Sequence, residues 1–153
     1  MALSNSVVVG LKAVDKADKW LVSGTVFLLV VRHWGVAAMW ALLGALLNAI
    51  VCKVTKKLLN QPRPGTAEKV DPGMPSSHAC SLMFLSVYAA CLFWTHGETN
   101  VYAAAVGVSG TIAAAAMLSL GALLSSLRYM FGHHTIAQVA VGAALGITDS
   151  FLW

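Results

Sequence analysis

One stretch of the chain decides its fold. It reads Asp-Pro-Gly-Met-Pro-Ser-Ser-His-Ala-Cys over residues 71–80, where a polar loop ends and an apolar run, Ala79–Trp94, begins. Gly73 and Pro75 are typical of a turn, and proline is not tolerated inside a helix. The stretch therefore predicts a turn followed directly by an apolar helix.

The start of this helix has the residues of an anion site. Either Ser76 or Ser77 can cap it. The free backbone N–H groups and the positive dipole end of a helix start favour a phosphate. His78 stands in the first turn, where it can exchange a proton with a bound anion. Taken alone, the stretch leaves open an alternative, a capped membrane helix with an interfacial histidine.

The composition indicates an integral membrane protein. Of the 153 residues, 58% are hydrophobic and 10% are charged, whereas a soluble domain carries roughly 25% charged residues. The net charge of +4 is small and gives no indication of a nucleic-acid partner. Cys52, Cys80 and Cys91 form no Cys-x-x-Cys pair, so neither a metal cage nor a disulfide framework is expected. We expect one domain over residues 1–153.

The apolar runs predict an all-α bundle of about five membrane-spanning helices. The expected spans are residues 13–31, 34–52, 78–95, 101–127 and 134–153. Residues 55–77 are expected to form one long polar loop, and Gly142 and Gly146 a close helix-packing face. Asp149 is expected at the far membrane edge. Residues 1–12 show no clean signal-peptide pattern and are expected to be interfacial.

The order of the spans places the basic residues on one side of the membrane. If the third and fourth spans both cross, the loop 53–77 and the break 128–133 lie on the same side. If the first span also crosses, the N-terminus joins that side, which then holds every lysine and arginine except Arg32. By the positive-inside rule it faces the cytosol, or the stroma of a plastid.

Three polar clusters are therefore expected on that side. The first has Lys56 followed, after six residues, by Arg63-Pro64; the second is Pro75-Ser76-Ser77-His78. The third has Arg128, His134 after five intervening residues, and Gln138 four further on. Each cluster alone is typical of a membrane edge. Together, in this order and on one side, they indicate a site.

With these clusters the chain resembles the type 2 phosphatidic acid phosphatase superfamily, membrane lipid phosphatases that share their site with vanadium haloperoxidases. The resemblance covers about residues 45–146. The matching residues are Lys56, Arg63, Pro64, Pro75, Ser76, His78, Arg128 and His134. Three positions depart from the family pattern. The family has glycine where this chain has Ser77, serine where it has Leu127, and an acidic residue where it has Gln138. With Ser77 and Gln138, the chain resembles the dolichyldiphosphatases and the plastidial lipid phosphate phosphatases of the epsilon group. The run over residues 58–64, followed by residues 71–74, resembles the plastidial group more closely.

The resemblance implies a role for each residue. Lys56, Arg63 and Arg128 would bind the phosphate together with the helix start at Ser76 and Ser77. His134 would attack phosphorus to form a phosphohistidine, and His78 would protonate the leaving oxygen. Gln138, one helical turn after His134, would orient its ring by accepting the ring N–H, without the charge of an acid. No metal or cofactor is implied.

The function expected from this resemblance is hydrolysis of phosphatidate to diacylglycerol and phosphate at the bilayer surface. The alternative substrate is a dolichyl or polyprenyl diphosphate; a non-catalytic lipid-phosphate binder and a small transporter remain as other readings. The implied location is a plastid membrane such as the chloroplast inner envelope, otherwise the endoplasmic reticulum. His133 is expected to point away from the site. Asp71 is expected either to touch the site or to cap the loop, and the loop is favoured. The oligomeric state is left open.

Overall fold

The computed structural model describes residues 6–14, 17, 24, 36–65, 71–96 and 107–153. Within them, residues 6–14 form a short helix, and four longer helices follow. These are α2 (Val36–Leu59), α3 (Ser77–His96), α5 (Gly110–Met130) and α6 (Ile136–Leu152). The described part of the chain contains no strand, so the all-α expectation is confirmed. The first expected span, residues 13–31, lies almost entirely outside the described residues.

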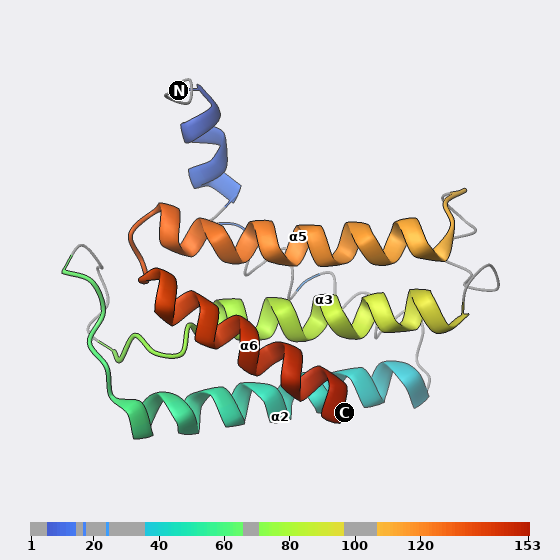
Figure 1. The fold of residues 1–153 in the computed structure, drawn as a ribbon, viewed down its shortest axis with the longest axis horizontal. Coiled ribbons are helices and arrows are strands. Elements are labelled where there is room, and N and C mark those ends of the chain that lie inside the picture. Colours follow the sequence, from blue (N-terminus) through green and yellow to red (C-terminus); the bar gives the residue numbers. More distant parts are fainter. Residues whose placement is uncertain (1–5, 15–16, 18–23, 25–35, 66–70, 97–106) are drawn as a thin grey trace.

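Helix α3 is the centre of the bundle. It lies between α5 and α2, and α6 crosses the bundle obliquely from the end of α5 toward α2 (Figure 1). Most of the buried hydrophobic residues belong to α3, among them Ala79, Phe84 and Val87. The helix that begins at the stretch 71–80 is therefore the one against which the others pack.

Helix α6 rests on α3 through two glycines. A Cβ atom on Gly142 would lie 2.5 Å from the backbone oxygen of Ser76, and one on Gly146 would collide with the backbone oxygen of Cys80. With hydrogen in place of a side chain, the two backbones approach closely. The expected packing face at these glycines is thus a contact inside the bundle, and it joins α6 to the start of α3.

Helix α2 is longer than the sequence predicted. The expected span ended at Cys52, with Lys56 and Lys57 in a loop, but the helix continues to Leu59. Both lysines therefore stand in its last turn, where a positive charge is favoured by the helix dipole. Asn60 ends the helix with a φ of 41°, a left-handed conformation that asparagine tolerates, and its N–H donates to the Lys56 carbonyl at 3.1 Å.

The other helices begin at side-chain caps. Ser109 accepts the N–H of Ile112 at the start of α5, so this helix begins later than the expected 101. Thr135 accepts the N–H of Gln138 at the start of α6 and forms a capping box with it. Residues 101–106, part of the expected fourth span, lie outside the described residues.

The outer surface of the bundle is apolar. Two described helices, at Ser77–Thr95 and Gly110–Met130, are long and apolar enough to cross a membrane, and α6 is a shorter apolar helix. Large hydrophobic side chains such as Leu46, Ile50 and Leu123 are exposed on α2 and α5. Such a surface is suited to lipid rather than to water.

The position of Asp149 differs from the sequence expectation. It was placed at the far membrane edge, but it lines a small pocket with Asn48 and Phe84, which lie well inside α2 and α3. The reason is the oblique course of α6, which leaves the level of Ser76 and meets α3 again near Phe84. Asp149 therefore lies beside the middle of α2 and α3 rather than at their far ends.

The glycine contact gives a first prediction. Gly142→Ala should lower the free energy of unfolding by about 1–3 kcal/mol, because the added methyl group overpacks a backbone contact. The measurement is the thermal unfolding midpoint in detergent micelles. Gly10→Ala is the matched control, since a Cβ atom there meets nothing within 4 Å. Equal midpoints for the two variants would contradict the close backbone packing.

Candidate active site

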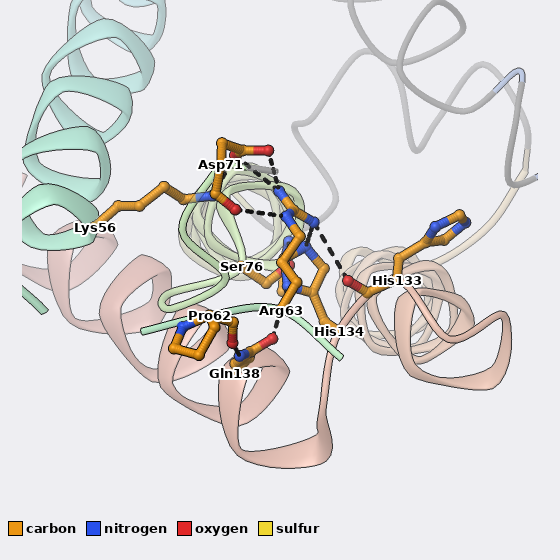
Figure 2. Close-up of polar contacts among 9 residues, drawn as sticks. Lys56, Pro62, Arg63, Asp71, Ser76, His133, His134 and Gln138 are labelled. Atoms are coloured by element: carbon orange, nitrogen blue, oxygen red, sulfur yellow. Dashed lines mark hydrogen bonds and ion pairs between the residues drawn. The ribbon is translucent and has the colours of Figure 1, made fainter. Parts of the chain in front are cut away.

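The three polar clusters come together at one end of the bundle, as the order of the spans predicted. Figure 2 shows Lys56 from α2, Arg63 and Asp71 from the loop, and His134 and Gln138 from the start of α6 around a single centre. The two arms of the loop are joined by a 2.6 Å hydrogen bond from the Gly73 N–H to the Gln61 carbonyl. The loop is thereby folded back over the start of α3 and α6.

The guanidinium of Arg63 is held by five acceptors of the protein itself. Its Nε donates to the backbone oxygen of Asp71 at 3.0 Å, and its Nη2 donates to both Asp71 carboxylate oxygens at 3.1 and 2.9 Å. Its Nη1 donates to the His133 carbonyl at 3.3 Å and contacts His134 Nε2 at 2.9 Å. All three guanidinium nitrogens are therefore engaged by the protein itself, and Nη2 contacts both oxygens of the same carboxylate.

Asp71 corrects an expectation from the sequence. It was predicted to cap the loop, but its carboxylate pairs with two cations of the site, with Arg63 at 2.9 Å and with Lys56 Nζ at 3.3 Å. The Lys56 and Arg63 side chains are 11% and 8% exposed, whereas that of Asp71 is 48% exposed. The hydrogen bonds from Arg63 lower the pKa of Asp71, so the carboxylate is ionised near neutral pH.

The backbone and one side chain fix the position of His134. The N–H groups of His133 and His134 both donate to the Arg128 carbonyl, at 3.0 and 3.1 Å, at the end of α5. Because Arg63 has only donors to offer, His134 Nε2 accepts, and the ring proton must be on Nδ1. His134 Nδ1 then donates to Gln138 Oε1 at 3.2 Å. The lone pair of Nε2 therefore points at the cationic cluster.

The surroundings keep His134 neutral. Its pKa is lowered from 6.5 to about 4, first by burial and then by the positive charge of Arg63, with smaller effects from Lys56 and Arg128. The hydrogen bond to Gln138 acts in the opposite direction but is outweighed. A buried imidazole beside three cations disfavours protonation, so Nε2 is unprotonated throughout the physiological pH range.

Gln138 connects all three clusters through its side-chain carboxamide and its backbone oxygen. Its Oε1 accepts from His134 Nδ1 and from the Thr135 N–H at 3.2 Å, and its Nε2 donates to the Pro62 carbonyl at 2.8 Å. Its backbone oxygen accepts the N–H of Ser76 at 2.9 Å. Gln138 is 1% exposed. An acid at this position would place an oxygen against the Pro62 carbonyl, so the amide suits this loop.

The remaining expected site residues occupy the same end of the bundle. Ser76 is fully buried, and its Oγ accepts the N–H of Ala79 at 3.4 Å, which makes it the cap of α3. Ser77 and His78 form the first turn of α3, and Arg128 stands in the last turn of α5.

Two residues next to the site, His133 and Leu127, do not place their side chains in it. The ring of His133 points away from the cluster, as predicted (Figure 2). Leu127, one of the departures from the family pattern, is 1% exposed and belongs to the core. Among the described residues no group of three or more His, Cys, Asp or Glu side chains is placed to hold a metal ion.

Comparison with known proteins identifies the family of the chain. The family model of the PAP2 superfamily matches residues 37–153. The chain belongs to the PAP2 superfamily. The fold resembles the crystal structure of a transmembrane PAP2-type phosphatidylglycerolphosphate phosphatase from Bacillus subtilis, with a TM-score of 0.63, 18% identity, and coverage of 97% of this chain and 85% of the other.

Two similar sequences are plant PAP2 proteins. Lipid phosphate phosphatases epsilon 1 and epsilon 2 of Arabidopsis thaliana, both chloroplastic, are 41% and 40% identical over 92% and 94% of this chain. The chain spans about half the length of these relatives, 48% in each case. A palmitoyl-protein thioesterase–dolichyl pyrophosphate phosphatase fusion from Schizosaccharomyces pombe is 28% identical over 72% of the chain and 17% of its own length.

Sequence reasoning missed two features of this PAP2 site. One is the double role of Gln138, although the spacing Thr135-x-x-Gln138 before an apolar run is a capping-box signal. The other is the pairing of Asp71 with Lys56 and Arg63. In the sequence, Asp71 is only an acidic residue eight positions after Arg63 in a loop, and this spacing does not reveal that the loop folds back.

The histidine geometry gives a second prediction. Nitrogen-15 NMR of imidazole-labelled protein should show His134 as the Nδ1–H tautomer at pH 7, with a titration midpoint near pH 4. The assignment would come from the signal that is lost in His134→Ala. A midpoint near 6.5, or the Nε2–H tautomer, would contradict the contacts with Arg63 and Gln138.

Gln138 gives a third prediction. Gln138→Glu should raise the pKa of His134, because a carboxylate stabilises the imidazolium, and should also loosen the loop at Pro62, where a donor is lost. Gln138→Leu is the matched control, which removes the amide without adding charge. The same NMR titration measures both variants, and an unchanged midpoint in Gln138→Glu would show that this side chain does not contact His134.

Proposed function

We propose that the chain is an integral membrane lipid phosphate phosphatase that acts without a metal ion. The observation that carries this proposal is the neutral His134, whose Nε2 lone pair faces Arg63 in a buried cationic cluster. A nucleophile and several cations at one point suit attack on a phosphoryl group, whose charge spreads over its oxygens in the transition state.

The first step transfers the phosphoryl group to the protein. His134 Nε2 forms a bond to phosphorus while the bond from phosphorus to the lipid oxygen breaks. His78 gives its proton to that leaving oxygen, and the lipid leaves as an alcohol. Lys56, Arg63, Arg128 and the N–H groups at Ser76 and Ser77 hold the phosphoryl oxygens.

The second step releases phosphate. Water attacks phosphorus, passes its proton to His78, and the bond to His134 Nε2 breaks, so both histidines return to their starting states. Gln138 keeps the His134 proton on Nδ1 throughout. Two histidines with opposite proton roles are suited to catalysis near neutral pH.

Phosphatidate is the proposed substrate, with diacylglycerol as the lipid product. The support is the similarity to the two lipid phosphate phosphatases epsilon, which also favours a chloroplast membrane such as the inner envelope as the location. A dolichyl or polyprenyl diphosphate is the second candidate. It is favoured by the likeness to the fission yeast fusion protein, which includes a dolichyl pyrophosphate phosphatase.

The test is phosphate release by the purified protein in mixed micelles containing EDTA. Phosphatidate and a polyprenyl diphosphate are offered in parallel. His134→Ala should reduce release by more than about 10³-fold, since it removes the nucleophile. Rapid quenching of the wild-type reaction with labelled phosphatidate should yield an acid-labile phosphoryl group on the protein that is lacking in the variant.

The outcomes separate the candidates. Preference for phosphatidate supports the proposed substrate, and preference for the diphosphate replaces it with the alternative. Release that is unaffected by His134→Ala would overturn the mechanism, and so would release that is seen only in a parallel reaction without EDTA. A folded protein that releases no phosphate from either lipid would favour a binder of lipid phosphates.

A further inference from the structure

The site is already occupied by an anion that belongs to the chain. The Asp71 carboxylate accepts two hydrogen bonds from Arg63 Nη2 and one from Lys56 Nζ, as a bound phosphate would. Arg63 Nη1 is directed at the Nε2 lone pair of His134. In this arrangement the cations are neutralised in part, and the nucleophile is covered by a hydrogen bond.

We propose that Asp71 is a specificity-determining residue, a resident carboxylate that only the dianion of a phosphate monoester displaces from Arg63 and Lys56. This inference rests on the proposed phosphatase function. It explains how a cationic site at a bilayer surface avoids the phosphodiester headgroups that surround it.

The charge of the incoming phosphate group determines whether it can replace the Asp71 carboxylate at Arg63 and Lys56. A phosphodiester headgroup carries one negative charge, as does the Asp71 carboxylate, so replacing one with the other gains no attraction to the cations. A phosphomonoester carries about −1.5 to −2 at pH 7 and three strong acceptor oxygens. The exchange therefore gains charge, and the phosphate has acceptors enough for Arg63 Nη2, which leaves the Asp71 carboxylate, and for Arg63 Nη1, which leaves His134 Nε2.

The positions of the side chains permit this exchange. The Asp71 side chain is 48% exposed at the outer side of the cluster, whereas the two cations are about nine-tenths buried. Rotation of the carboxylate toward water leaves the hydrogen bond from Arg63 Nε to the Asp71 backbone oxygen in place. The loop can thus keep Arg63 positioned while the carboxylate gives way to the ligand.

The experiment compares Asp71→Asn, which removes the charge and keeps the shape, with Asp71→Glu, which keeps the charge. Competitive inhibition of phosphatidate hydrolysis by inorganic phosphate and by phosphatidylglycerol is measured in mixed micelles. In Asp71→Asn the inhibition constant of phosphate should fall about 10-fold, because a charge-assisted competitor is lost. The same variant should become sensitive to phosphatidylglycerol, while Asp71→Glu and the wild type remain insensitive.

If Asp71 has only a structural role, Asp71→Asn should change phosphate binding in the opposite direction. If the carboxylate only positions Arg63, Asp71→Asn should weaken phosphate binding and raise KM, which would overturn the inference. Competitive inhibition of the wild type by phosphatidylglycerol would also overturn it, without any variant.

A binding measurement separates this inference from the proposed function. The shift of the His134 nitrogen-15 signals on titration with inorganic phosphate requires no turnover. Tighter phosphate binding by Asp71→Asn in a chain that hydrolyses no lipid would refute the proposed function and keep the inference. Binding that is equal in Asp71→Asn and the wild type would refute the inference.

Discussion

The hydrogen bonds of the Gln138 carboxamide are the interaction on which the site depends. One side chain accepts from the ring of His134 and donates to the loop that carries Arg63, while its backbone accepts from Ser76 at the start of α3. His134, the loop that carries Arg63 and the start of α3 are therefore held in register by a single residue. Because it is buried, water does not compete for these bonds.

The bilayer environment explains why polar groups gather at one end. Helices with apolar outer surfaces leave few places for charged side chains. Lys56 extends from the last turn of α2, Arg63 comes from the loop, and His134 follows the end of α5. The loop folds back over these helix ends, so the charges of all three segments act on the same small volume and lower the pKa of His134.

Much of this arrangement could be predicted from the sequence, and the failures have physical causes. The apolar runs predicted the described helices, and the order of the spans predicted that the three clusters meet at one end of the bundle. The length of α2 was missed because lysines in a last helical turn resemble a polar loop, and only the left-handed Asn60 marks the end. The pairing of Asp71 was missed because it depends on the path of the loop, which local sequence does not determine.

The contact between α6 and α3 bears on how the protein responds to its membrane. At Gly142 the two helices meet backbone to backbone, at the level of Ser76, with no flexible side chain between them. The backbones touch again one helical turn further along, at Gly146 and Cys80. If a thinner or thicker bilayer changes the tilt of α6, the start of α3 must therefore move with it, and Ser76 keeps its place relative to the start of α6, which His134 precedes.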